Sequence, residues 1–191
     1  ATLFQLPYPE VFSYLKEGKV TNTNNDPYAG WMQDVLYHYG SEILHNNIKI
    51  KLLDNPSHLE LASPVVNGYL KSIQENIIKN NAVNKSMSII THGDASFSGQ
   101  GIVSELFNMK NLQPYDIGGT IHIVVNNQIG FTTNPEETKS NGYCTDIAKA
   151  YNIPIIHVNA DDVESCINVA NLSYQYKMTF QKDILIDLVG Y

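Results

Sequence analysis

Apolar segments of two different periods alternate along the second half of the chain, and this alternation constrains the fold more than any other feature. Short runs rich in β-branched residues predict strands, and between them apolar residues recur at the spacing of an amphipathic helix. Strands that alternate with helices form βαβ units, in which the strands run parallel. The strand segments are almost continuously apolar, as expected where helices cover both faces. We predict an α/β fold with a doubly wound, mainly parallel sheet and helices on both faces.

The same periods give the expected elements. Strands are expected at 49–53, 87–91, 120–125, 155–158 and 184–189, and helices at 65–78, 99–111, 145–151 and 163–177, with a polar loop at 79–86. Asp161 or Asp162 would cap the last helix. Residues 1–30 are expected to form an irregular lead-in, and 31–191 a single domain. The chain stops on an apolar strand, so we expect that domain to be incomplete at its C-terminal end, as in a fragment of a longer protein.

Composition excludes several function classes. The 12 basic and 19 acidic residues give a net charge of −7, and no run of Lys and Arg predicts nucleic-acid binding. No apolar run approaches the roughly 20 residues of a membrane span. The two cysteines, Cys144 and Cys166, lack a metal-ligand spacing and are expected to be reduced thiols.

Two loops that follow predicted strands carry small and polar residues. The first, residues 91–101, contains Asp94, and the second, residues 126–133, begins with Asn126-Asn127. In such sheets ligands bind beyond the carboxyl ends of the strands, and a helix N-terminus there favours phosphate. Carboxylate, amide and carbonyl oxygens are the ligands of Mg²⁺, which substrate phosphates often complete. The residues therefore suggest a site for Mg²⁺ and a diphosphate.

Simpler interpretations exist for both loops. The first could be only a glycine-rich turn, and the second only an Asx turn. For either segment alone the simpler interpretation is favoured, whereas their occurrence at successive strand ends favours a ligand site. A dinucleotide-binding module is a poorer match, because Gly99-Gln100-Gly101 lacks the rest of the Gly-x-Gly-x-x-Gly pattern.

The segment from Asp94 to Thr133 resembles the thiamine-diphosphate motif, which begins Gly-Asp-Gly and ends Asn-Asn. Ala95 replaces the last glycine, and the interval is longer than in the common form. Both departures are typical of the E1 component of the 2-oxoglutarate dehydrogenase complex. Several other segments of the sequence also resemble that family, among them His92-Gly93-Asp94-Ala95, Asn55-Pro56-Ser57-His58-Leu59-Glu60, Val125-Asn126-Asn127-Gln128-Ile129-Gly130, Tyr143-Cys144-Thr145-Asp146 and His157-Val158-Asn159-Ala160-Asp161-Asp162.

This resemblance implies thiamine diphosphate and Mg²⁺ as cofactors. Asp94, the side chain of Asn127 and the carbonyl of Ile129 would bind Mg²⁺. Ala95 and Ser96 would line the diphosphate.

Two histidines are implied to be catalytic. His58 matches an active-site histidine of the family, and His38 resembles a second one that meets the 2-oxoacid. Ser57 and Leu59 would also lie at the cofactor. A histidine suits these tasks because it can hydrogen-bond a carboxylate and move protons near neutral pH. For His92, packing or support of the metal aspartate is as plausible as catalysis, and a lone histidine is more often structural.

The family's reaction is the oxidative decarboxylation of 2-oxoglutarate in the tricarboxylic acid cycle. The succinyl unit passes to a lipoyl-bearing E2 succinyltransferase, and E3 dihydrolipoamide dehydrogenase completes the complex. A homodimer is expected for the full-length protein. The acid that activates the aminopyrimidine belongs to a later domain of the family, so we expect this chain alone to be inactive. The location would be the mitochondrial matrix in a eukaryote or the cytoplasm in a bacterium.

Three alternatives remain. The closely related 2-oxoadipate dehydrogenase E1 has a similar pattern. A different thiamine-dependent decarboxylase or a transketolase-like enzyme would fit the Ser57-to-Glu60 and Tyr143-to-Asp146 strings less well. A non-catalytic binding domain could keep the sheet, although loss of function would tend to remove Asp94 and Asn127.

Overall fold

The computed structural model describes residues 38, 40–130, 132–140 and 142–190, so the expected lead-in at 1–30 lies outside the described residues. The chain divides into two compact units, residues 1–57 and 58–191.

In the first unit the described residues form an antiparallel hairpin of β1 (Ser41–His45) and β2 (Ile48–Leu52). Asn46 and Asn47 connect the strands with φ of 48° and 63°. Asparagine tolerates this left-handed conformation, which a two-residue hairpin turn requires at both positions. The strand expected at 49–53 is confirmed as β2, whereas β1 was not expected because its sequence lacks a clear apolar alternation.

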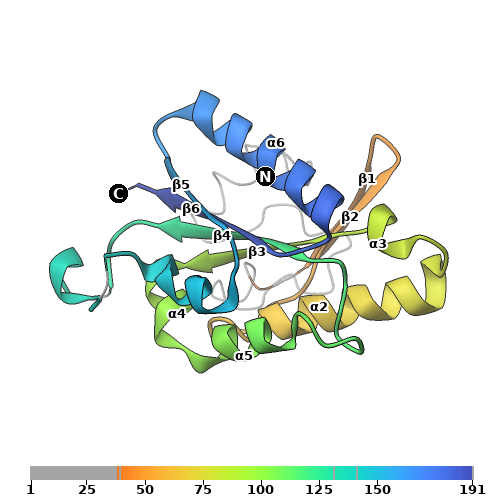
Figure 1. Ribbon diagram of the computed structural model, residues 1–191, viewed down its shortest axis with the longest axis horizontal. Helices are drawn as coiled ribbons and strands as arrows, with labels where there is room; N and C mark the ends of the chain where they lie inside the picture. The colour runs from red at the N-terminus through yellow and green to blue at the C-terminus, as the bar shows by residue number, and fades with distance from the viewer. Residues whose placement is uncertain (1–37, 39, 131, 141, 191) are drawn as a thin grey trace, which may run out of the picture. The chain divides into compact units, whose positions relative to one another are not determined.

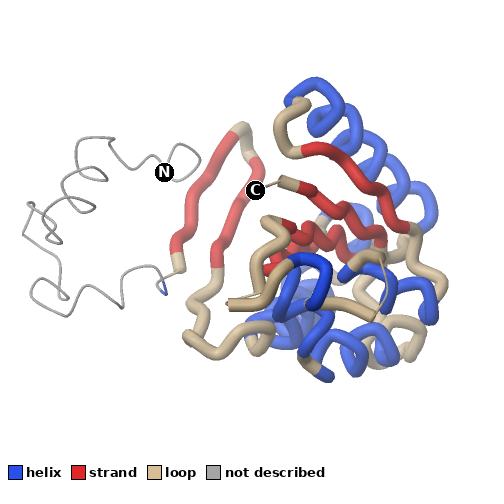
Figure 2. The backbone as a smooth tube through the Cα atoms, turned by 90° about the vertical axis from the view of Figure 1, so that its left-hand side faces the viewer, coloured by secondary structure: helices blue, strands red, loops and turns tan. Residues whose placement is uncertain are grey.

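The second unit contains a four-stranded parallel sheet, as the alternation predicts. Its strands are β3 (Ser88–Gly93), β4 (Thr120–Asn126), β5 (Ile155–Asn159) and β6 (Ile184–Val189), in the order β3-β4-β6-β5. Helix α6 (Val163–Phe180) covers one face, and α2 (Ala62–Ile73), α4 (Asp94–Gly99), α5 (Gly101–Met109) and the 3₁₀ helix η4 (Cys144–Tyr151) lie on the other (Figure 1). Figure 2 shows the strands between these two layers. The predicted doubly wound α/β fold is confirmed.

The direction of the connections explains which helix lies on which face. The chain moves one way across the sheet from β3 to β4 and on to β5, and returns from β5 to β6. Parallel crossovers are almost always right-handed. Connections that move in opposite directions therefore place their helices on opposite faces, and α6 lies opposite α4, α5 and η4 (Figure 1).

A separate apolar core fills each face of the sheet. Under α6, buried residues of β4, β5 and β6 pack against the helix. On the other face, Phe97 and Phe107 from α4 and α5 pack against Val124, Leu185 and the η4 residue Cys144. Neighbouring residues of one strand point to opposite faces, so β6 serves both cores with Ile184 and Leu185.

Several expected boundaries were wrong in detail. The helix expected at 99–111 is two helices, because Gln100 is extended (φ −124°, ψ 131°) and α4 already begins at Asp94. The helix expected at 65–78 changes at Gln74 into a π-helix, η2 (Gln74–Ile78). The loop expected at 79–86 contains a short helix, α3 (Ala82–Lys85). Asp162 is the N-cap of α6, since its side chain accepts a hydrogen bond from the Ser165 amide at 3.0 Å.

Within the described part of the chain, none of the helices combines the length and apolar character that crossing a membrane requires.

Candidate diphosphate and metal site

The two predicted ligand segments lie side by side at the carboxyl ends of two neighbouring strands. β3 and β4 are adjacent and parallel, with Gly93 opposite Val125. Asp94 follows the end of β3, and Asn126 is the last residue of β4. A methyl group on Gly130 would lie 4.0 Å from the methyl carbon of Ala95, so the two loops approach each other closely. The predicted pairing of these segments is therefore present in the fold.

Asp94 is buried at the N-terminus of α4, a position where the helix dipole favours a carboxylate. It forms an ion pair with Lys139, whose Nζ lies 3.4 Å from Oδ2. The Lys139 side chain is only 13% exposed, so solvent screens this pair less than a surface pair. Sequence reasoning missed Lys139, because a single lysine in an irregular segment carries no motif.

The chain after β4 forms two successive Asx turns. Asn126 Oδ1 accepts from the Gln128 amide at 3.1 Å, and Asn127 Oδ1 accepts from the Ile129 amide at 3.0 Å. Gln128 has φ of 61°, and its side chain donates to the carbonyl of Gly190. The Asn126 side-chain amide donates to Asp187 at 3.1 Å. Each asparagine thus shapes the turn, while Asn127 and Ile129 remain exposed.

The donor atoms suit a hard divalent cation. Asp94 offers a carboxylate, Asn127 an amide oxygen with one lone pair beyond its turn bond, and Ile129 a main-chain carbonyl. These are the oxygen types that Mg²⁺ takes, and it usually keeps water and phosphate as further ligands. Among the described residues no three His, Cys, Asp or Glu side chains cluster as a metal site. A site with a single carboxylate would not form such a cluster, so the predicted ligand set fits Mg²⁺ by its chemistry.

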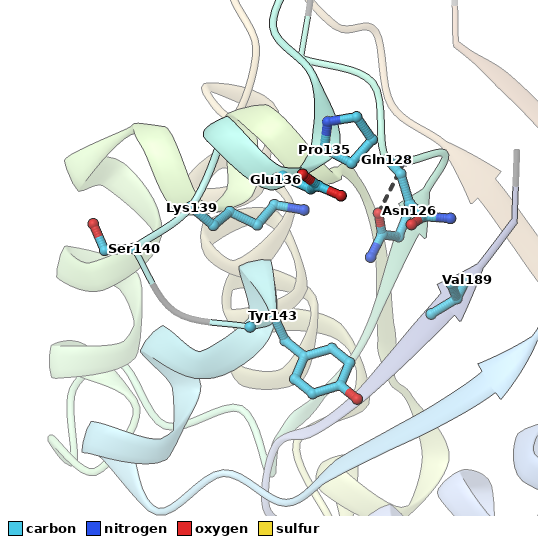
Figure 3. A pocket seen from close by; sticks show the side chains of 9 residues that line it. Asn126, Gln128, Pro135, Glu136, Lys139, Ser140, Tyr143 and Val189 are labelled. Atoms are coloured by element: carbon cyan, nitrogen blue, oxygen red, sulfur yellow. Dashed lines mark hydrogen bonds between the residues drawn. The ribbon is translucent and has the colours of Figure 1, made fainter.

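A pocket of about 350 Å³ adjoins these loops. It lies between the carboxyl ends of β4 and β6 and the residues 135–140 and 142–143 (Figure 3). Its lining combines polar and apolar side chains, namely Asn126, Gln128, Pro135, Glu136, Lys139, Ser140, Gly142, Tyr143 and Val189. Figure 3 shows the Lys139 ammonium directed toward Asn126 and Gln128. The volume of the pocket is within the range of small-molecule sites.

A buried chain of polar side chains runs beneath the end of β3. Glu60 Oε2 lies 2.6 Å from His92 Nδ1, and His92 Nε2 lies 3.0 Å from His122 Nδ1. Burial opposes ionisation of Glu60, but the hydrogen bond and charge of His92, together with two serine hydroxyls, outweigh it and lower the pKa of Glu60. Burial, followed by the charge of His92, holds the pKa of His122 well below its ordinary value. Glu60 is thus a buried carboxylate, and His122 a neutral ring.

The remaining predicted residues fall into two groups. In the first unit, His38 Nδ1 lies 3.1 Å from the Asn55 side chain, and Ser57 is exposed. In the second unit, His58, Leu59 and Ala95 are exposed, whereas Ser96 is buried and donates to Glu60 Oε1 at 2.7 Å. The roles of all of these residues stay predictions.

The chain is similar in sequence to known proteins over its whole length. A family model described as "Dehydrogenase E1 component" matches residues 20–191. Similar relatives include the proteins named 2-oxoglutarate dehydrogenase E1 component from Bacillus cereus (strains G9842 and B4264) and Bacillus anthracis (strain A0248). Each is 45% identical over 199 residues, and the alignment covers 100% of this chain. The chain spans 21% of the length of each of these relatives.

Proposed function

Because this chain belongs to the dehydrogenase E1 component family, we propose that it supplies the diphosphate and metal half of a thiamine-diphosphate site in a 2-oxoglutarate dehydrogenase E1. The observation that supports the proposal is that the segment containing Asp94 and Ala95 lies beside the Asn126–Gly130 turn, at the ends of two neighbouring strands. The chain spans 21% of its relatives, so the activity is proposed for the protein that contains it.

The proposed roles follow the donor chemistry of the site. Asp94, the Asn127 side chain and the Ile129 carbonyl would bind Mg²⁺, and Ala95 would let the diphosphate approach the start of α4. Lys139 adds positive charge beside Asp94, which supports binding of a diphosphate in a chain with net charge −7. Thiamine diphosphate, when bound, supplies the electron sink for decarboxylation of a 2-oxoacid.

Other residues are proposed for the cofactor and the substrate. His58, and with it His38, would hydrogen-bond the 2-oxoacid or move a proton. Ser57 and Leu59 would contact the cofactor. Ser96, also proposed at the diphosphate, has its hydroxyl on Glu60, so its contribution there would come from its main chain.

The whole protein is proposed to act on 2-oxoglutarate, with a lipoyl-bearing E2 succinyltransferase and an E3 dihydrolipoamide dehydrogenase as partners and a homodimer as its state. The relatives named above are bacterial proteins and give a mitochondrial location no support. Where the chain comes from a bacterium, we propose the cytoplasm.

The test is thermal stabilisation of the full-length protein by thiamine diphosphate with Mg²⁺. A ligand at about a hundred times its Kd adds roughly 2.7 kcal/mol of stability, which raises the Tm by several degrees. The Asp94→Ala variant should lose this shift. The matched control is Glu105→Ala, which removes the same charge from the exposed surface of α5 and should keep the shift.

Turnover of 2-oxoglutarate with a dye acceptor completes the test, with 2-oxoadipate measured in parallel. We expect the parent protein to prefer 2-oxoglutarate and Asp94→Ala to be inactive. A parent protein with neither a thermal shift nor turnover would rule out the proposed function. A shift without turnover of either acid would favour a non-catalytic binding domain.

A further inference from the structure

Glu60 adopts a backbone conformation that needs support from its surroundings. It lies two residues after His58 and just before α2, and its φ is 70°. A residue other than glycine with positive φ costs free energy, and it persists only where neighbouring contacts hold it. The turn around it is closed by the Leu61 amide, which donates to the His58 carbonyl, and by the Ser63 amide, which donates to the Glu60 carbonyl. The position of Glu60 therefore fixes the main chain at His58.

The side chain of Glu60 is held by the same segment that carries Asp94. Its side chain is 3% exposed. Its Oε2 lies 2.6 Å from His92 Nδ1, and its Oε1 accepts a hydrogen bond from the Ser96 hydroxyl at 2.7 Å. The Ser63 hydroxyl adds a longer bond of 3.4 Å. His92 and Ser96 each lie two residues from Asp94, one before it and one after it. The carboxylate thus links the His58 turn to both sides of the proposed metal ligand.

His92 is itself fixed from three directions. Its Nε2 lies 3.0 Å from His122 Nδ1, and the two rings stack at 5.2 Å. Phe97 packs edge-on against the ring at 5.0 Å. His92 is 4% and His122 is 1% exposed, so neither ring has room to turn away. Glu60 therefore contacts a rigid support rather than a mobile side chain.

We propose that Glu60 is a positioning residue, which holds His58 at a fixed place relative to Asp94 through His92 and Ser96. The inference rests on the proposed function, because it assumes that His58 and Asp94 serve one reaction. It also assigns the Ser96 hydroxyl to Glu60 rather than to the diphosphate. A displacement of about 1 Å at a reacting group can cost a hundredfold in rate, so a carboxylate that sets this spacing controls turnover without touching substrate.

The test uses the full-length protein and the Glu60→Gln variant. Glutamine keeps the size of the side chain but turns an amide N–H toward one of the two donors, so one of these hydrogen bonds is lost. We expect kcat/KM for 2-oxoglutarate to fall by at least about tenfold. The affinity for thiamine diphosphate with Mg²⁺ should change by less than about threefold, because Asp94 and the turn after β4 stay in place.

A double-mutant cycle with His58→Ala separates positioning from general loss of stability. If Glu60 acts by positioning His58, then Glu60→Gln should have little effect in the His58→Ala variant, because the side chain that it positions is already absent. In that variant it should lower kcat/KM by less than about twofold. A purely structural defect would lower kcat/KM by the same factor in both backgrounds.

The matched control is Ser88→Ala. Ser88 and Thr120 form a buried hydroxyl pair at 2.8 Å, at the opposite ends of the same two strands β3 and β4. Its loss should lower the Tm while kcat/KM stays within about twofold of the parent. If Glu60→Gln does not fold, Ser96→Ala removes one donor from the same carboxylate and should lower kcat/KM about threefold to tenfold, again only when His58 is present.

The outcomes are distinct. The positioning role is wrong if the parent protein is active and Glu60→Gln leaves kcat/KM unchanged. It is also wrong if Glu60→Gln lowers kcat/KM by the same factor in the parent and in His58→Ala. Neither result contradicts the proposed function. A parallel loss of cofactor affinity would also overturn it. A parent protein that does not turn over 2-oxoglutarate removes the proposed function and the inference together.

Discussion

Three polar side chains near the carboxyl ends of the strands hydrogen-bond to one buried carboxylate. Asp187 of β6 is fully buried and accepts bonds from Asn126, Thr145 and His157, at 3.1, 3.3 and 2.8 Å. These partners come from β4, η4 and β5. Asp187 therefore joins three elements and also orients the asparagine that begins the proposed metal turn.

Cys144 lies in the apolar core on this side of the sheet, and its thiol gives a prediction for alkaline pH. Burial, and after it the charge of Asp187, raises the pKa of Cys144 from 9.0 to about 12. Between pH 9 and 12 the unfolded chain has lost a proton that the native thiol keeps, so stability falls as pH rises. The loss from this group is about 1.4 kcal/mol between pH 8 and 10.

The measurement is urea unfolding of the parent protein and Cys144→Ala at both pH values. Other ionisations affect both proteins alike, so the stability advantage of the parent should narrow by about 1.4 kcal/mol from pH 8 to pH 10. An advantage that is the same at both pH values would contradict the raised pKa.

Single residues differ in how far the sequence could predict them. Asp94 and Asn127 could be proposed as metal ligands from the sequence, because both lie in short loops that follow predicted strands. Glu60 and Asp187 could not be assigned, since their roles depend on donors from other elements, up to 61 residues away in the chain. Ser96 was predicted to line the diphosphate, which stays a prediction, and only the structure gives Glu60 as the partner of its hydroxyl.

At the scale of elements, the start of β4 depends on a glycine that no other residue can replace without strain. Gly119 has φ of 81°, and a methyl group there would lie 2.3 Å from the main-chain carbon of Lys182. The close approach lets the Thr120 amide donate to Asp183 at 2.8 Å. Overpacking and the left-handed conformation should together lower the stability of Gly119→Ala by about 2–4 kcal/mol.

The matched variant is Gly68→Ala in α2, where a methyl group would meet nothing within 4 Å. Alanine loses less backbone entropy than glycine in a helix, so this change should stabilise the protein by about 0.5–1 kcal/mol. Thermal or urea unfolding measures the stability of both variants relative to the parent protein. If the two substitutions change stability by the same amount, then the close contact at Gly119 does not destabilise Gly119→Ala.

Predicted elements were most accurate where one physical signal was strong. The expected strand at 184–189 coincides with β6, and that at 120–125 with all but the last residue of β4, because a buried parallel strand needs a continuous apolar run. Boundaries failed where local geometry decided. The early start of α4, the extended Gln100 and the π-helix at Gln74 all depend on packing that no period in the sequence reports.

At the scale of the whole molecule, the order of the strands explains how distant loops meet. β4 and β6 occupy the two inner positions of the sheet, with β3 and β5 at its edges. The alternation of elements predicted a parallel sheet, but it did not determine this order, since several orders obey the same crossover rule. That the loops after β3 and β4 are neighbours, as the proposed site requires, therefore follows only from the strand order in the structure.

The same topology predicts how stability is distributed along the chain. β4 and β6 each pair with two neighbours, and helices cover both of their faces. Among the described residues β1 and β2 pair only with each other, and most of their residues are exposed. A two-stranded hairpin is marginal alone, and local opening is easiest where little apolar surface is buried. We expect the hydrogen-bonded amides of β1 and β2 to exchange at least about a hundredfold faster than those of β4 and β6.

Hydrogen–deuterium exchange followed by mass spectrometry or NMR measures this directly, with each rate divided by the intrinsic rate of the unfolded chain. β5 supplies an internal comparison, because among the described strands it lies at the edge of the sheet and pairs with β6 alone. Its amides should exchange at rates between those of the hairpin and of β4. Equal protection of the hairpin and of β4 would mean that both open only in global unfolding, and the uneven distribution of stability would be wrong.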